Sequence, residues 1–70
     1  MSKVTASMAG NVWKILVKKG DAVANGQEVA IIESMKMEIP ITADREGRVK
    51  EVTAGEGDFV NEGDPILELE

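Results

Sequence analysis

Ala6–Glu33 (ASMAGNVWKILVKKGDAVANGQEVAIIE) and Ala43–Glu70 (ADREGRVKEVTAGEGDFVNEGDPILELE) are two copies of one pattern. A shift of 37 positions aligns them without a gap, and eight of the 28 aligned positions are identical. Three of the identities are glycines, each beside a strand-like run, and apolar positions such as Val29 and Ile66 also match. Two copies favour a pseudo-symmetric closed unit, because a stacked solenoid usually needs about three repeats or more.

Alternation and short apolar runs predict strands rather than helices. The alternating apolar residues are Val4, Ala6 and Met8, and the apolar runs are 12–17 and 29–32. Seven glycines also interrupt the chain too often for ordinary helices. The sequence therefore predicts an all-β fold of short strands. We expect a single domain over residues 1–70, with repeat halves at about 6–33 and 43–70 and a hairpin at 34–37 between them.

Turns are predicted at matching places in the two halves. Glycine supplies a positive φ there, and a neighbouring Asp or Asn can accept a hydrogen bond from a nearby backbone N–H. The predicted turns are Gly20-Asp21 with Gly57-Asp58, and Asn25-Gly26 with Glu62-Gly63. Folding alone explains these residues.

Composition excludes several classes of function. The chain has no Cys and no His, so we expect no disulfide and no thiolate or imidazole metal site. It also has no apolar run of about 20 residues, so we expect no membrane span. Residues 36–70 contain ten acids against four bases, within a net charge of −5, which disfavours nucleic acid as a partner. The acidity serves solubility or a basic partner surface. We expect a cytoplasmic protein that is monomeric in isolation.

The segment between the halves lacks ordinary turn chemistry. Residues Ser34-Met35-Lys36-Met37 contain no Gly, Asn, Asp or Pro, although they must join two strand-like runs. Lys36 at the centre of this segment is a candidate attachment point. The flanking methionines allow two interpretations: they fill gaps at the end of the barrel, or they form an adaptable apolar collar around the lysine.

Met35-Lys36-Met37 follows Glu33 and lies between two copies of a Gly-x-Val…Gly-Asp-x-Val…Gly pattern. This arrangement resembles the biotin/lipoyl attachment domain, more narrowly the biotinyl domains of biotin carboxyl carriers and the small free-standing attachment proteins. The resemblance covers about residues 4–70. It implies a flattened β-barrel, or barrel-sandwich hybrid, of two four-stranded sheets related by a pseudo-twofold axis, with the modified lysine on an exposed hairpin.

The resemblance also implies a function. Lys36 would be acylated by a biotin protein ligase through biotinyl-adenylate, with Met35 and Met37 flanking the adduct. Ser34 stands where the family usually has Ala, and Ser34 and Glu33 are candidates for ligase recognition. The biotin would carry a carboxyl group from a biotin carboxylase site to a carboxyltransferase site. The domain would be a substrate and carrier with no catalytic residues of its own.

The sequence allows three other functions. A lipoyl carrier of a 2-oxo acid dehydrogenase system, modified by a lipoate ligase, uses the same design, but methionine on both sides of Lys36 favours biotin. A Schiff-base or serine enzyme is disfavoured, because Glu33 and Glu38 neighbour Lys36 and no His can activate Ser34. An unmodified interaction module of the same fold is the third alternative.

Trp13 is the only tryptophan, and the repeat aligns it with the polar residue Lys50. We therefore expect Trp13 to face outward in part and to pack over a sheet edge or the N-terminal strand. A role in docking to the carboxylase or ligase is the functional alternative, because aromatic residues are enriched at interfaces.

Overall fold

A computed structural model describes residues 2–70, and the regular elements in this range are eight β-strands. The strands are β1 (Ser2–Thr5), β2 (Gly10–Ile15), β3 (Ala22–Val23), β4 (Glu28–Ser34), β5 (Met37–Thr42), β6 (Gly47–Val52), β7 (Phe59–Val60) and β8 (Pro65–Leu69). No helix in this range is long and apolar enough to cross a membrane.

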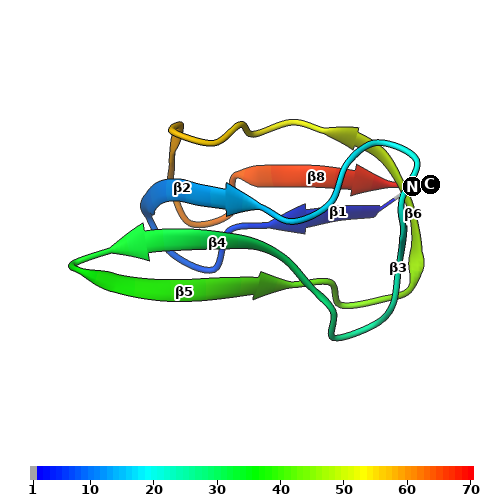
Figure 1. Ribbon diagram of the computed structural model, residues 1–70, viewed down its shortest axis with the longest axis horizontal. Coiled ribbons are helices and arrows are strands. Elements are labelled where there is room, and N and C mark those ends of the chain that lie inside the picture. The colour runs from blue at the N-terminus through cyan, green and yellow to red at the C-terminus, as the bar shows by residue number, and fades with distance from the viewer. Residues whose placement is uncertain (1) are drawn as a thin grey trace.

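The strands form two antiparallel sheets of four, with orders β1-β8-β6-β3 and β5-β4-β2-β7. The two sheets lie face to face, and the β4–β5 hairpin projects from one end of the molecule (Figure 1). The molecule is elongated, with principal extents of 31 × 19 × 18 Å. The predicted all-β fold of two four-stranded sheets is confirmed.

The sequence repeat reappears as a pseudo-twofold relation between strands. Strands β2 and β6 have bounds 37 residues apart, and so do β3 and β7. Adding four to each strand number, and counting on from β8 to β1, converts the order β1-β8-β6-β3 of one sheet into the order β5-β4-β2-β7 of the other. Backbone hydrogen bonds repeat too: Gly20 N–H donates to Val49 O (2.9 Å), and Gly57 N–H donates to Val12 O (2.8 Å).

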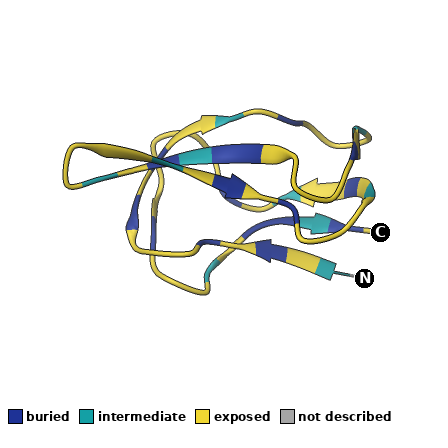
Figure 2. Cartoon of the chain, turned by 90° about the horizontal axis from the view of Figure 1, so that it is seen from below, coloured by how far each residue is buried: buried dark blue, intermediate teal, exposed yellow. Residues whose placement is uncertain are grey.

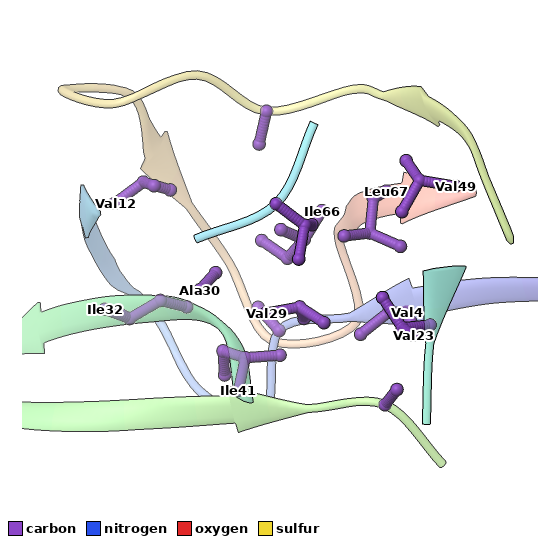
Figure 3. Packing of buried hydrophobic residues seen from close by; sticks show 14 of the residues in the cluster. Val4, Val12, Val23, Val29, Ala30, Ile32, Ile41, Val49, Ile66 and Leu67 are labelled. Carbon is purple, nitrogen blue, oxygen red and sulfur yellow. The ribbon is translucent and has the colours of Figure 1, made fainter. Parts of the chain in front are cut away.

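The buried residues of the core occur at equivalent positions of the repeat. Sixteen hydrophobic residues are buried between the sheets, and all of them fall into pairs 37 residues apart. Figure 3 shows side chains from both sheets meeting in this layer. Each buried Val, Ile or Leu contributes about 1.5–3 kcal/mol. The pairs are Val4/Ile41, Ala6/Ala43, Val12/Val49, Val17/Ala54, Val23/Val60, Val29/Ile66, Ala30/Leu67 and Ile32/Leu69.

The four predicted turn glycines, at positions 20, 26, 57 and 63, all have positive φ. Asp21 Oδ2 accepts a hydrogen bond from Lys18 N–H, and Asp58 Oδ2 accepts one from Gly55 N–H, both at 2.9 Å. The second pair of turns differs from expectation. There the acceptors are Gln27 and Asp64, one residue after each glycine, rather than a residue before it.

Two apolar stretches are shorter as strands than the pattern suggested. Strand β1 ends at Thr5, and the chain bends at Ser7 and Met8, which leaves Met8 exposed. Strand β2 ends at Ile15, so Leu16 is exposed while Val17 is buried. Alternation identified Val4 and Ala6 correctly as buried, but it was wrong for Met8, because it could not locate the bend that ends the strand.

Candidate functional site

The candidate site is the tip of the β4–β5 hairpin. Ser34 pairs with Met37 as the last cross-strand pair, so Met35 and Lys36 alone form the turn. The expected connection at 34–37 is thus a two-residue loop. Because β4 and β5 are the most extensively paired neighbours, they carry the tip beyond the rest of the fold (Figures 1 and 2).

The turn holds two ordinary residues in the left-handed region. Met35 has φ 51° and Lys36 has φ 65°, and they are the non-glycine residues with positive φ among residues 2–70. Two successive positive φ values define a type I′ turn, which normally contains Asn-Gly. Each side chain placed in this region costs about 1–2 kcal/mol. The hairpin therefore keeps Met-Lys at a site where other residues would fold more easily.

The base of the hairpin is supported by a close backbone approach at Gly10, the first residue of β2. A Cβ at this position would lie 2.6 Å from Ile32 Cγ2, 2.7 Å from Glu33 O and 3.2 Å from Ser34 Cβ. Only glycine fits without displacing β4 just before the turn. Sequence reasoning marked Gly10 as a repeated glycine and missed its contact with the hairpin.

The methionine side chains are in solvent. Met35 is 90% exposed and Met37 is 63% exposed, which rules out the interpretation that they fill gaps at the end of the barrel. The reason is geometric, because a tip two pairs beyond the core has nothing to fold back on. The apolar collar around Lys36 stays a prediction.

Lys36 is exposed, and among residues 2–70 its side chain forms no hydrogen bond or ion pair. Glu33 and Glu38 lie directly opposite each other, one pair below Ser34 and Met37. Ser34 is half-buried at the base of the turn. The structure thus brings all five predicted site residues to one end: Glu33, Ser34, Met35, Lys36 and Met37.

Trp13 faces outward in part, as expected, with 44% of its surface exposed. Its own strand is neither a sheet edge nor a neighbour of the N-terminal strand. Trp13 lies at an irregularity of β2, which is an inner strand of its sheet, whereas β1 belongs to the other sheet. Lys14 Nζ lies 5.5 Å from the Trp13 ring centroid, within range of a cation–π contact.

Residues 2–69 match the model of the family described as "Biotin-requiring enzyme", which is the biotin/lipoyl family. The chain belongs to this family. The match spans all eight strands and includes the hairpin, so the resemblance inferred from the Met-Lys-Met tip and the repeat is confirmed.

Relatives within the biotin/lipoyl family differ greatly in length. The chain is 70% identical over 66 residues to the biotin/lipoyl attachment protein of Bacillus subtilis, covering 94% of this chain and 90% of that one. It is 49% identical over 69 residues to the mitochondrial propionyl-CoA carboxylase alpha chain of Homo sapiens, covering 99% of this chain but only 10% of that one.

A solved structure has the same fold as this chain. The urea carboxylase of Kluyveromyces lactis superposes with a TM-score of 0.89 at 32% identity, over 97% of this chain and 6% of that one. The chain therefore matches almost the whole of a small attachment protein in sequence, and it superposes on a small part of a much larger carboxylase.

Proposed function

We propose that this chain is a biotin carrier domain, modified on Lys36, that moves a carboxyl group between the two active sites of a biotin-dependent carboxylase. The observation that supports this most is the position of Lys36. It occupies the second residue of an exposed two-residue turn, between two exposed methionines, in a chain of the biotin/lipoyl family. The proposed unit spans residues 1–70, with its halves joined by the hairpin.

Attachment forms an amide between Lys36 Nζ and the carboxyl carbon of biotin. In the reaction with biotinyl-adenylate, AMP leaves and the ammonium group loses two of its three protons, so the net charge of −5 becomes more negative by one. A lysine amine in water is protonated at neutral pH. Since Lys36 is exposed and its side chain has no hydrogen-bond acceptor among residues 2–70, the biotin protein ligase supplies the base and the activated acyl group.

The chain itself contributes the position of the cofactor. The cofactor supplies the carboxyl-transfer chemistry, and tethering it to a protein raises its effective concentration at each site. Rigid strands β4 and β5 hold Lys36 away from the body, so that the tip can enter a partner's active site. Biotin carboxylase and carboxyltransferase are the proposed partners, in line with the carboxylases among the relatives. The cysteine-free composition supports a cytoplasmic location.

Lipoate is the second candidate cargo. The observation in its favour is the Bacillus subtilis relative, which is described as a biotin/lipoyl attachment protein. An exposed lysine on a type I′ turn suits a lipoate ligase equally well in geometry. The two methionines beside Lys36 are the residues that favour biotin.

Intact mass measurement tests the cargo and the site together. The chain is co-expressed with a biotin protein ligase and, separately, with a lipoate ligase. We expect one biotinyl group on the wild-type chain and none on Lys36→Arg. Lys14→Arg is the matched control and should be modified like the wild type.

Two outcomes would contradict the proposal. A biotinyl group that persists in Lys36→Arg would show that the site is wrong. A lipoyl group in place of biotin would reverse the assignment of the cargo while leaving the site intact.

A further inference from the structure

The internal repeat allows each surface residue to be compared with a counterpart at the equivalent position of the other half. A residue that the fold itself requires should have a similar counterpart. In the core, all sixteen buried positions form pairs 37 residues apart in which both members are apolar. Exposed large hydrophobic residues behave differently. Four of them have a counterpart in the other copy, and none of the counterparts is large and apolar. The pairs are Met8/Arg45, Trp13/Lys50, Leu16/Thr53 and Phe59/Ala22.

These surface differences are not explained by folding. Trp13 and Lys50 lie at equivalent irregularities of β2 and β6, and both are exposed. Phe59 pairs with Asn11 across β7 and β2, as Ala22 pairs with Arg48 across β3 and β6. The sheet without the aromatic residues has the same topology, so the fold does not require them.

Two of these residues, Trp13 and Phe59, lie on the outer face of the sheet that carries the hairpin, together with Ile31 and Pro40. Pro40 on β5 pairs with Ile31 on β4, and Ile31 pairs with Lys14, next to Trp13 on β2. Phe59 lies diagonally from Trp13, within reach of an aromatic side chain. We call Trp13, Ile31, Pro40 and Phe59 the apolar band. Ile31 and Pro40 also have charged counterparts, Glu68 and Lys3.

The charges beside the apolar band indicate the chemistry of its partner. Glu33 and Glu38 face each other across β4 and β5, in the row that continues to Asn11 and Phe59. Like charges directly opposite each other destabilise a sheet. Lys14, over the Trp13 ring, offsets part of this negative charge, and a partner with basic residues at its rim would offset the rest.

We propose that the apolar band is the surface by which the carboxylase that works on the loaded arm holds the carrier. This rests on the proposed function. The partner surface has an apolar depression bordered by Lys or Arg side chains, and the band supplies the aromatic anchors that such interfaces favour.

The length of the loaded arm favours the carboxylase over the ligase. The ligase reacts at Lys36 Nζ, so the hairpin itself enters its active site. In carboxyl transfer the reacting nitrogen belongs to the biotin ring, at the far end of a flexible arm. Contacts at the tip then orient the ring poorly, and the body of the carrier must be held as well.

The test exchanges the band residues for those that the other half of the chain already accepts. Biotinylated Trp13→Lys/Phe59→Ala is assayed as substrate of purified biotin carboxylase and carboxyltransferase components. Lys50→Ala/Ala22→Ser, on the opposite sheet, is the matched control. We expect the KM for the band variant to rise about tenfold or more in at least one half-reaction, the loss expected for two anchor residues. The kcat of the band variant, its rate of biotinylation and its thermal unfolding should remain those of the control.

Each other outcome overturns the proposal. An unchanged KM in both half-reactions would show that the carboxylase does not use the band. A matching rise in the KM for the ligase would assign the band to the ligase. Self-association of the wild type that the band variant abolishes, measured by sedimentation, would assign it to a second copy. A failure of the proposed function is distinguished from a failure of this proposal by intact mass, because in that case the wild-type chain carries no biotin before any carboxylase assay.

Discussion

At the scale of single residues, equivalence in the repeat does not mean equivalent surroundings. Gly10 and Gly47 begin β2 and β6 at matching positions. A Cβ at Gly10 would meet Ile32 Cγ2 at 2.6 Å, whereas a Cβ at Gly47 would make an ordinary contact with Leu69 Cβ at 3.4 Å. Gly10 is therefore required where the hairpin leaves the body, and Gly47 is not required in the same way.

We predict that Gly10→Ala destabilises the fold by about 1–3 kcal/mol, the usual cost of overpacking. Its added methyl group must displace Ile32 or the backbone of Glu33. Gly47→Ala is the matched control, and it should change stability between zero and a gain of about 1 kcal/mol, because alanine restricts the unfolded chain. Urea unfolding measures both. Equal losses for the two variants would contradict this account of Gly10.

At the scale of elements, the β4–β5 hairpin combines a stable ladder with an unfavourable turn. The ladder continues to the Ser34–Met37 pair, which fixes the turn at two residues. A two-residue loop imposes positive φ on Met35 and Lys36, whatever their preferences. The strain is thus concentrated at the proposed attachment site, as expected when function rather than folding selects the residues.

We predict that Met35→Asn stabilises the protein by about 1 kcal/mol, because asparagine tolerates the left-handed region better than methionine. For a domain of this size, this corresponds to a rise in Tm of about 4–8 °C. Met37→Asn is the matched control: Met37 lies in β5 and has no positive φ, so its Tm should not rise. Thermal unfolding by circular dichroism gives both values. A Tm for Met35→Asn no higher than that of the wild type would contradict the strain argument.

At the scale of the whole molecule, the ends of the chain meet at the pseudo-twofold counterpart of the hairpin. Ser2 pairs with Leu69, which corresponds to the pairing of Ile39 with Ile32 at the base of the tip. Figure 1 shows the two ends together, opposite the β4–β5 tip. Ser2 and Leu69 therefore lie at the opposite end of the molecule from Lys36.

We predict that a circular permutant keeps the fold and loses the modification. A four-residue linker, Ser-Asn-Gly-Thr, joins Glu70 to Met1, and the chain is opened between Met35 and Lys36. Because one short loop replaces another, the free energy of unfolding should change by about 1 kcal/mol or less. Biotinylation should fall at least tenfold, since a terminal lysine is no longer held at the turn.

The permutant is compared with one that has the same linker and is opened between Gly55 and Glu56, where the tip stays intact. Urea unfolding and intact mass report the two quantities. A normal rate of biotinylation in the chain opened at the tip would show that the ligase needs only the local sequence.

The sequence alone determined the fold class, the repeat and the place of Lys36 between its halves. It could do so because buried positions are constrained by alternation and by packing density, and both copies obey the same constraints. The core pairs Val12/Val49 and Ile32/Leu69 express this regularity. The absence of turn residues at 34–37 likewise indicated a site selected for something other than folding.

The tertiary structure decided what depends on residues distant in sequence. It set Met35 and Met37 in solvent, brought Gly10 against the base of the hairpin, and placed Trp13 and Phe59 on one face. Strand order and register fix these neighbours, and local pattern does not encode them. A surface residue obeys no packing rule of its own, so its partners become known only when the chain has folded.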